Sequence, residues 1–337
     1  MRTPESGVSF MARLRERLRA TPSKQRIVFP EGDDTRVQVA AGQLAGEGLL
    51  KPVLLVSSAL EVSAGVEAVR PEESPQLGKY ARLLWERRRS RGLSEMEAVE
   101  QAARPLYFAA LMVEAGDAEG EVAGAVHATA DAVQAIMHSI EMLPGRSLLS
   151  SAHLLAVQDR SYGCDGLLVF ADAALVVRPT PIELAEIAIA AADVTRTVLE
   201  TEPLVALLSF STKGSARHKE VDRILEALRY IKARRPELQV DGELQADAAL
   251  LLPAGRSKAP GSLVAGRANT LVFPDLNSAN IGYKLVERLG GAALLGVILE
   301  GLSRPVNIVS KGCTSEDIVH TAILTATQAA RAQRVGA

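Results

Sequence analysis

Cysteine is scarce in this chain. Only Cys164 and Cys313 occur among its 337 residues, too few for a metal cluster or for the disulfide framework of a small secreted protein. The five histidines include no pair four positions apart, the spacing with which one helix face binds zinc. We therefore expect no metal site.

Long apolar runs and an excess of charge of one sign are also missing. No apolar stretch reaches the roughly 18 residues of a membrane-spanning helix, and no segment has the pattern of a signal peptide. The formal net charge is −2, which gives no general attraction to nucleic acid, so a polyanionic ligand would have to meet local cations. We expect a cytoplasmic protein without a nucleic-acid or membrane partner.

Two common nucleotide-binding motifs cannot be found. The loop at 211–215 has Lys213 before Gly214 and lacks the earlier glycine of an ATP-binding P-loop. The glycines of 290–296 follow a predicted helix, which is a poor match to the dinucleotide motif G-x-G-x-x-G. A nicotinamide-dependent decarboxylating dehydrogenase, which would also need a metal, therefore has no motif in its favour.

What the chain does have is a regular alternation of apolar strands and helical segments. With 47% hydrophobic and 23% charged residues, it can form two full cores. The alternation requires crossover connections and indicates an α/β fold with mostly parallel sheets. The expected strands are 26–30, 52–56, 121–126, 167–170, 204–208, 239–245 and 270–274.

Two segments between these strands have specific predictions. One continuous helix is expected over 80–102, and a polar loop over 275–284. In open α/β sheets the carboxyl ends of the strands line the ligand crevice, so the polar loops that follow them should converge on one side.

A polar turn at 310–317 is the strongest single candidate for chemistry. Ser310 and Lys311 offer a hydroxyl and a cation that can hold an anion, and Gly312 lets the backbone approach closely. Asp317 lies where a helix from residue 318 would start, within reach of a proton. An ordinary turn and helix cap explains the same composition, because serine, threonine and aspartate are good capping residues.

Several sequence blocks in a fixed order resemble one family. They include Ser-Thr-Lys-Gly-Ser, Asp-Gly-Glu-Leu-Gln, Phe-Pro-Asp-Leu-Asn and Pro-Val-Asn, and they lie at 26–36, 107–131, 208–215, 241–249, 273–284 and 305–317. Together they are similar to the signature blocks of the phosphate acetyltransferases (phosphotransacetylases), a family that includes phosphate butyryltransferases. The resemblance covers nearly the whole chain.

The resemblance implies a fold and a reaction. The fold is two three-layer α/β domains with an interdomain cleft, of the isocitrate/isopropylmalate dehydrogenase type, in a homodimer. The reaction is reversible transfer of an acetyl or short acyl group between an acyl phosphate and coenzyme A, with acetyl phosphate, acetyl-CoA and phosphate among the ligands. We expect the first domain over residues 1–146 and 297–337, including the loop at 310–317, and the second over 147–296.

The resemblance also implies catalytic residues in the 310–317 loop. Asp317 matches the base that takes the proton of the coenzyme thiol, whose ordinary pKa of about 8.5 leaves little thiolate. Ser310 and Lys311 are expected to stabilise the charge that develops on the carbonyl oxygen and on the departing phosphate. Because the thiol attacks directly, no cysteine nucleophile is needed, and Cys313 is expected to pack as a small residue.

Substrate contacts are expected from several further regions. Arg88 aligns with an arginine that the family uses toward substrate, whereas Arg87, Arg89 and Arg91 are interpreted as a solvated basic helix face. The backbone N–H groups of the Ser-Thr-Lys-Gly-Ser loop are expected to point at an anion. The full set of expected substrate-binding residues is Arg88, Thr129, Gln134, Ser211, Thr212, Lys213, Ser215, Asn280, Tyr283 and Lys284.

Two positions depart from the family where phosphate should bind. Lys311 replaces an arginine, which keeps the charge but loses the planar fork that suits phosphate. Gln134 is neutral where the family usually has an arginine. Losing such an arginine removes a few kcal/mol of transition-state stabilisation. The alternative to a working enzyme is a divergent paralogue that retains coenzyme A or acyl-phosphate binding without fast catalysis.

Overall fold

The structure, a computed structural model, describes residues 3–335 and divides into two compact units. The N/C unit comprises Met11–Gly145 and the chain from Leu302 onward, and the central unit comprises Arg146–Gly301 with the residues up to Phe10. Both units are built from helices and a mostly parallel sheet, so the predicted α/β class is confirmed. The domain boundaries after residues 146 and 296 stay a prediction. The second of these boundaries falls inside strand β10 (Ala293–Glu300).

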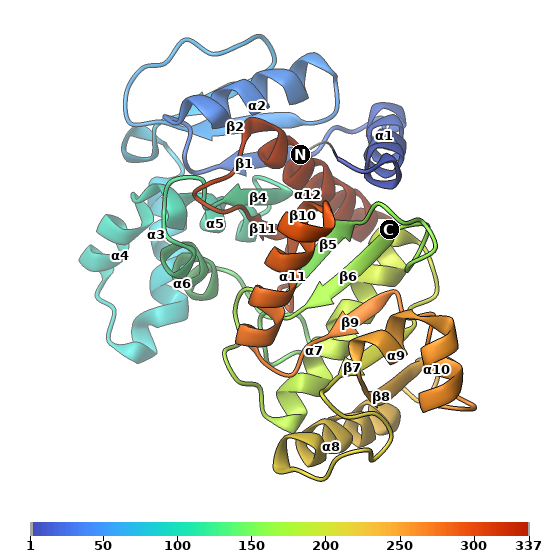
Figure 1. Cartoon of the computed structure of the whole chain (residues 1–337). Coiled ribbons are helices and arrows are strands. Elements are labelled where there is room, and N and C mark those ends of the chain that lie inside the picture. Colours follow the sequence, from blue (N-terminus) through green and yellow to red (C-terminus); the bar gives the residue numbers. More distant parts are fainter. Residues whose placement is uncertain (1–2, 336–337) are drawn as a thin grey trace. The chain divides into compact units, whose positions relative to one another are not determined.

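Parallel strands form the sheet of the N/C unit, in the order β3-β2-β1-β4-β11 (Figure 1). Because β1, β4 and β11 are consecutive in this order, the loops after their carboxyl ends lie next to one another. The strands are β1 Arg26–Phe29, β2 Lys51–Leu55, β3 Glu67–Val69, β4 Gly120–Ala123 and β11 Val306–Ile308.

Helices connect these strands, except for the first helix of the chain, which precedes β1 and whose residues are divided between the two units. The last one, α12 (Ser315–Val335), packs on β4 and on α2, and it buries apolar residues such as Val319 and Ile323. The others are α1 Glu5–Ala20, α2 Thr35–Gly46, α3 Leu77–Arg88, α4 Glu95–Ala102, α5 Pro105–Glu114 and α6 Thr129–Ser139, with short 3-10 turns at Pro71–Glu73 (η1) and Arg89–Arg91 (η2).

The single helix predicted over 80–102 is wrong, because the segment forms α3, η2 and α4. Gly92 has a φ of 90°, a left-handed conformation that ends the first helical stretch. Ser94 then begins α4 with a capping box, in which its hydroxyl accepts the N–H of Glu97 and the Glu97 carboxylate accepts the N–H of Ser94. The helical periodicity of the sequence continues through this break and therefore hides it.

The sheet of the central unit is mixed, in the order β10-β5-β6-β9-β7-β8. Strand β5 (Ser150–Ala156) is antiparallel to both β10 and β6, and the other pairs are parallel. The alternation of strands and helices does not predict β5, because no helix separates it from β6. The remaining strands are β6 Leu167–Ala171, β7 Val205–Leu208, β8 Val240–Leu244 and β9 Thr270–Val272.

The polar loop predicted over 275–284 is also wrong, because most of it is helical. Asp275 caps α11 (Leu276–Gly290) by accepting the N–H of Ser278 at 2.8 Å. The predicted contacts Asn280, Tyr283 and Lys284 therefore lie on a helix. The other helices of the central unit are α7 Pro181–Val194 with a π-helical turn at Thr195–Leu199 (η3), α8 Lys219–Arg234, α9 Ala246–Leu250 and α10 Leu252–Lys258.

Residues 3–335 contain no helix that is both long enough and apolar enough to cross a membrane.

Glu121 is a carboxyl group inside the core of the N/C unit. It lies on β4 between Val28 of β1 and Val306 of β11, and it is 0% exposed. Neither of its carboxyl oxygens has a hydrogen-bond partner in the described part of the chain. Burial, and after it the charge of Glu31, raises the pKa of Glu121 well above the ordinary value of 4.5. Glu121 is thus a protonated and unsatisfied group that weakens the core.

Glu121→Met should stabilise the protein by about 1–3 kcal/mol near neutral pH, because it removes an unsatisfied buried polar group at similar volume. The gain should increase as pH rises above 4.5. In that range the unfolded chain releases the Glu121 proton while the folded chain keeps it, so the stability of the wild type falls with rising pH. Urea unfolding at about pH 5 and about pH 8 measures both effects. A free energy of unfolding equal to that of the wild type at both pH values contradicts the prediction.

Candidate active site

A buried glutamate fixes the loop that follows β4. Glu31 lies just after β1, and β1 pairs with β4, so the loops after these strands meet at one edge of the sheet. Its carboxylate is 2% exposed. It accepts hydrogen bonds from the backbone N–H groups of residues 124–127 at 2.6–2.9 Å, and it contacts Nδ1 of His127 at 2.9 Å. Four amide donors on one carboxylate hold this loop in a single conformation.

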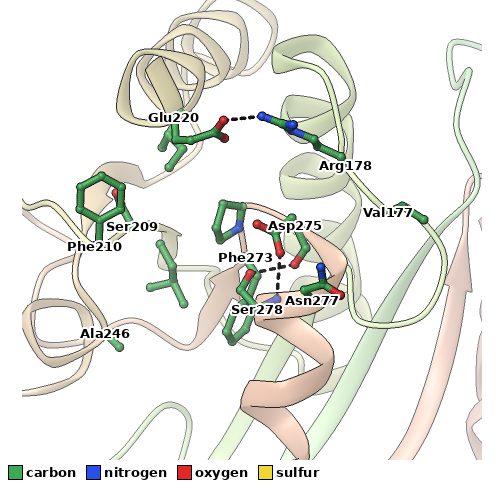
Figure 2. A pocket seen from close by; sticks show the side chains of 13 residues that line it. Val177, Arg178, Ser209, Phe210, Glu220, Ala246, Phe273, Asp275, Asn277 and Ser278 are labelled. Carbon is green, nitrogen blue, oxygen red and sulfur yellow. Dashed lines mark hydrogen bonds and ion pairs between the residues drawn. The ribbon is translucent and has the colours of Figure 1, made fainter. Parts of the chain in front are cut away.

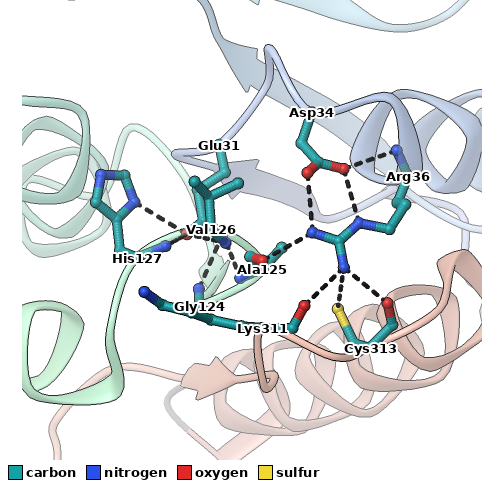
Figure 3. Close-up of polar contacts among 9 residues, drawn as sticks. All are labelled: Glu31, Asp34, Arg36, Gly124, Ala125, Val126, His127, Lys311 and Cys313. Carbon is teal, nitrogen blue, oxygen red and sulfur yellow. Dashed lines mark hydrogen bonds and ion pairs between the residues drawn. The ribbon is translucent and has the colours of Figure 1, made fainter.

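Arg36 joins this loop to the candidate catalytic loop at 310–317 (Figure 3). Nη2 of its guanidinium donates to the carbonyl of Ala125 at 2.8 Å, and Nη1 donates to the carbonyls of Lys311 and Cys313 at 2.8 and 2.9 Å. One planar group with several donors therefore connects the loops that follow β1, β4 and β11.

Asp34 holds the Arg36 guanidinium in place. Its two carboxylate oxygens accept from Nε and Nη2 at 3.0 and 2.9 Å. The hydrogen bond from the Arg36 side chain is the main reason that the pKa of Asp34 lies below its ordinary value. Asp34 also caps α2 by accepting the N–H of Arg36 at 2.8 Å. The orientation of the arginine is thus set within its own helix turn before it reaches the neighbouring loops.

The Arg36 contacts fix the backbone of the 310–317 loop, in which the side chains of Ser310 and Lys311 are exposed. The hydroxyl of Ser310 and the ammonium of Lys311 have no hydrogen bond or ion pair within residues 3–335. Cys313 is buried beside Arg36, and burial is the main cause that raises the pKa of its thiol. These features favour packing for Cys313 and anion binding for the two exposed side chains.

Asp317 caps helix α12. Its Oδ2 accepts the backbone N–H and the hydroxyl of Thr314 at 2.7 and 2.9 Å, and its own N–H donates to Oγ1 of Thr314 at 3.2 Å. The helix therefore begins at Ser315 rather than at residue 318. Oδ1 of Asp317 has no hydrogen bond in the part of the chain that the structure describes. The capping and the catalytic interpretations are compatible, because capping uses one oxygen and leaves the other able to accept a proton.

Two predicted substrate contacts of the N/C unit, Arg88 and Gln134, line one cavity of about 340 Å³. Arg88 is the last residue of α3, and Gln134 lies in the middle of α6. The exposed Thr129 is the first residue of α6 and comes directly after the loop that Glu31 holds. Helix α6 therefore runs from that loop to the cavity.

The Ser-Thr-Lys-Gly-Ser loop of the central unit does not offer its backbone to an anion, contrary to the prediction. Each N–H from residue 211 to residue 216 donates to an acceptor within the unit. The main acceptor is Glu243, which is 1% exposed. Its Oε1 accepts from the hydroxyl of Ser211 and from the N–H of Gly214, both at 2.8 Å. A buried carboxylate thus occupies the position from which an anion would contact this loop.

The other predicted contacts in this loop also hold the loop together. Oγ1 of Thr212 accepts the N–H of Gln245 at 2.9 Å, and Oγ of Ser215 accepts the N–H of Thr212 at 3.0 Å. The ammonium of Lys213 forms an ion pair with Asp241. Burial acts to raise the pKa of Asp241, but hydrogen bonds, first of all that from Lys213, outweigh it and leave the pKa below its ordinary value.

Of the predicted contacts on α11, Tyr283 packs against a buried histidine. Asn280 donates through Nδ2 to the carbonyl of Ala173 at 3.1 Å. The ring of Tyr283 lies 4.8 Å from that of His153 on β5, and Nζ of Lys284 lies 5.4 Å from the centre of the Tyr283 ring. Burial, followed by the charge of Lys284, lowers the pKa of His153 to about 3, so the imidazole is neutral. No motif contains this residue, and its burial becomes visible only in the fold.

A second cavity, of about 630 Å³, lies in the central unit after the carboxyl ends of β7 and β9 (Figure 2). Its walls are partly apolar, with Leu208, Phe210 and Phe273, and Arg178 and Glu220 form an ion pair at its rim. The predicted substrate contacts are not among its lining residues. Residues that neighbour the predicted contacts in the sequence line the cavity instead. Its mixture of apolar and charged groups suits an organic ligand with a polar end.

No three histidine, cysteine, aspartate or glutamate side chains within residues 3–335 are grouped as a metal site would require.

The chain matches a known family along most of its length. The model of the phosphate acetyl/butaryl transferase family matches residues 9–326. The phosphate acetyltransferase of Thermoanaerobacterium thermosaccharolyticum is 42% identical over 319 residues, which cover 92% of this chain and 97% of that protein. This chain belongs to the phosphate acetyl/butaryl transferase family. The phosphate acetyltransferase of Clostridium acetobutylicum is 41% identical over 321 residues, or 93% of this chain and 96% of that protein.

A solved structure agrees with this family membership. The phosphotransacetylase of Streptococcus pyogenes superposes on the chain with a TM-score of 0.88 at 40% identity, covering 96% of this chain and 99% of that structure. The family predicted from the sequence blocks is therefore confirmed, and the chain is an enzyme of the transferase class. The individual site residues stay predictions.

Glu31→Gln should lower the free energy of unfolding by about 2–4 kcal/mol, because the amide loses the negative charge that four backbone donors share. Urea unfolding measures the loss. Hydrogen exchange of the amides of residues 124–127 should also become faster relative to that of the core strands.

Glu72→Gln is the matched control for this substitution. Glu72 is exposed and has no hydrogen bond or ion pair within residues 3–335, so its replacement should change stability by less than about 0.5 kcal/mol. If Glu31→Gln behaves like this control in both measurements, the proposed bracing of the loop is refuted.

Proposed function

We propose that this chain catalyses the reversible transfer of an acetyl or other short acyl group between an acyl phosphate and coenzyme A. Membership of the phosphate acetyl/butaryl transferase family supports the reaction class. The structural observation that carries the proposal is the 310–317 loop, whose backbone Arg36 holds while the side chains of Ser310 and Lys311 stay exposed. A hydroxyl and a cation on a fixed backbone can stabilise a developing anion with little reorganisation.

In the proposed mechanism the coenzyme thiol attacks the acyl carbon directly. Asp317 accepts the thiol proton on Oδ1, the oxygen that the capping box leaves without a partner. As the new carbon–sulfur bond forms, the π electron pair of the carbonyl moves onto its oxygen; when this pair returns, the carbon–oxygen bond to phosphate breaks and its electron pair leaves with the phosphate. Ser310 and Lys311 meet the negative charge first on the carbonyl oxygen and then on the phosphate. No covalent enzyme intermediate is required.

The remaining parts of the proposal concern ligands and assembly. Coenzyme A, acetyl-CoA, acetyl phosphate and phosphate act as substrates and products, and no cofactor is permanently bound. The enzyme is proposed to be a cytoplasmic homodimer. Light scattering coupled to size exclusion tests the assembly, because a homodimer has twice the 35.8 kDa mass of the chain.

A divergent paralogue without fast catalysis is the second candidate, and two positions favour it. Lys311 lacks the planar fork of arginine, and Gln134 is neutral. An assay that follows thioester absorbance distinguishes the two candidates. Turnover with acetyl, propionyl or butyryl phosphate supports the enzyme, whereas coenzyme binding without turnover of any of the three supports the paralogue.

Asp317→Asn should lower kcat about 100-fold or more with little change in the KM for coenzyme A, because it removes the proton acceptor. Thr314→Ala is the matched control, since it breaks the same capping box but keeps the carboxylate. Each variant should lose about 1 kcal/mol of stability through the cap. Steady-state kinetics with acetyl phosphate check the prediction. Similar kcat values for the two variants would assign Asp317 to capping alone.

Lys311→Arg should raise kcat/KM for acetyl phosphate up to about tenfold, because a guanidinium can bind two phosphate oxygens at once. Lys311→Met removes the charge and should lower kcat/KM by about 100-fold. Both constants come from initial rates at varied acetyl phosphate and saturating coenzyme A. If the arginine, lysine and methionine forms have the same kcat/KM, residue 311 does not contact the transferred group.

A further inference from the structure

The cavity that contains Arg88 and Gln134 is lined by more positive charge than the sequence analysis assigned to it. Besides Arg88 it is lined by Arg91 of η2 and by Arg104, which precedes the first residue of α5. We call this site the arginine cavity. It brings together three guanidinium groups from separate turns, although Arg91 was interpreted as part of a solvated helix face and Arg104 was not singled out.

The three arginines of the cavity lack the partners that most nearby arginines have. Within residues 3–335, no hydrogen bond or ion pair reaches the side chain of Arg88, Arg91 or Arg104. By contrast, Arg82 pairs with Glu86 at 2.9 Å, and Arg87 pairs with Glu114 at 2.6 Å. Within the same residues Arg89 has no ion pair either, but it lies over the Trp85 ring, 5.2 Å from its centre, and does not line the cavity. The three arginines that line the cavity therefore have donors available for a ligand.

The one acidic residue that lines the arginine cavity already has partners. The carboxylate of Glu97 accepts the N–H and the hydroxyl of Ser94 at 2.9 and 2.7 Å, as the cap of α4. These hydrogen bonds, first of all that from the Ser94 backbone, also lower the pKa of Glu97. Glu97 therefore stabilises a helix start, and its one carboxylate against three guanidinium groups leaves the lining of the cavity with a net positive charge.

A neutral polar pair forms another part of the cavity lining. The hydroxyl of Tyr107 lies 2.9 Å from Nδ1 of His138, and both residues line the cavity with Gln134. The pKa of His138 is lowered by burial first and then by the charges of Arg88 and Arg91, so this imidazole adds no positive charge near neutral pH. The pair supplies hydrogen-bonding groups without compensating the arginines.

We infer that Arg104 and Arg91 complete, with Arg88, a binding site for a phosphate group of a substrate. Three guanidinium groups that form no direct ion pair within residues 3–335, at a concave surface with a net positive lining, match the charge and the several acceptor oxygens of a phosphate dianion. Arg104, the residue before α5, supplies the cation that residue 134 on α6 does not provide. This inference rests on the proposed function, because it takes the phosphate from a ligand of that reaction.

The phosphate that the site takes has two possible sources. One is the acyl phosphate, or inorganic phosphate in the reverse direction, and the other is a phosphate of coenzyme A. Dephospho-coenzyme A, which keeps the thiol and the diphosphate but lacks the phosphate on the ribose, separates the contributions within the coenzyme.

Arg104→Gln tests the site, with Arg82→Gln as the matched control. Both substitutions remove one positive charge from the same unit, but Arg82 does not line the arginine cavity. Arg104→Gln should raise the KM of one phosphate-bearing substrate about 10- to 100-fold and leave kcat within about threefold, and Arg91→Gln should act in the same direction more weakly. The dependence of log KM on log salt should also become less steep.

The pattern of KM values identifies the source. A larger KM for coenzyme A but not for dephospho-coenzyme A assigns the ribose phosphate, an equal rise for both assigns the diphosphate, and a larger KM for acetyl phosphate assigns the acyl phosphate. KM values for every substrate that match those of Arg82→Gln overturn the inference.

If the wild type has no turnover, the proposed function fails while the site can still be tested. Calorimetric titration of the whole protein with coenzyme A, and separately with inorganic phosphate, then takes the place of KM. Weaker binding of either probe by Arg104→Gln than by Arg82→Gln supports the site, and equal binding of both probes, or no binding to the wild type, refutes it.

Discussion

The guanidinium of Arg36 is the contact on which the candidate active site depends. It binds backbone carbonyls in the loops after β4 and β11 while Asp34 fixes its orientation. Short parallel strands place these loops side by side, and a backbone hydrogen bond from the N–H of Val309 to the carbonyl of Ala123, at 2.8 Å, continues the pairing beyond β11. Farther along, the Arg36 side chain connects the two loops, and the backbone that it holds positions the exposed side chains of Ser310 and Lys311.

Buried carboxylates provide a second common constraint. Glu31 in the N/C unit and Glu243 in the central unit each accept N–H groups from the loop after a neighbouring strand. Asp172 acts within its own turn, the one that follows β6, where it accepts the N–H of Ala174 at 2.9 Å. Loops at the carboxyl edge of a parallel sheet present many unpaired N–H groups, and an acid on an adjacent segment satisfies several of them at once. These acids hold the conformations of the loops.

The sequence predicted the features that periodicity and motif order determine, and it missed those that depend on tertiary contacts. Alternating apolar segments predicted the α/β class, and the order of the blocks predicted the family. Periodicity could not show the break at Gly92, because a single left-handed residue leaves the helical pattern on both sides intact. Composition could not show that Lys213 pairs with Asp241, nor that Arg104 and Arg88 line one cavity, because each pair is brought together only by the tertiary fold.

The left-handed turn at Gly92 has a consequence for how the arginine cavity can change during evolution. The turn separates α3 from α4 and lets Arg88 and Arg91 end one helical stretch instead of lying along the side of a longer helix. A side chain at this position would disfavour the turn by about 1 kcal/mol and favour a continuous helix. The shape of an anion site would then be altered by a residue that carries no charge. Backbone geometry at one glycine thus sets where two of the charges of the cavity lie.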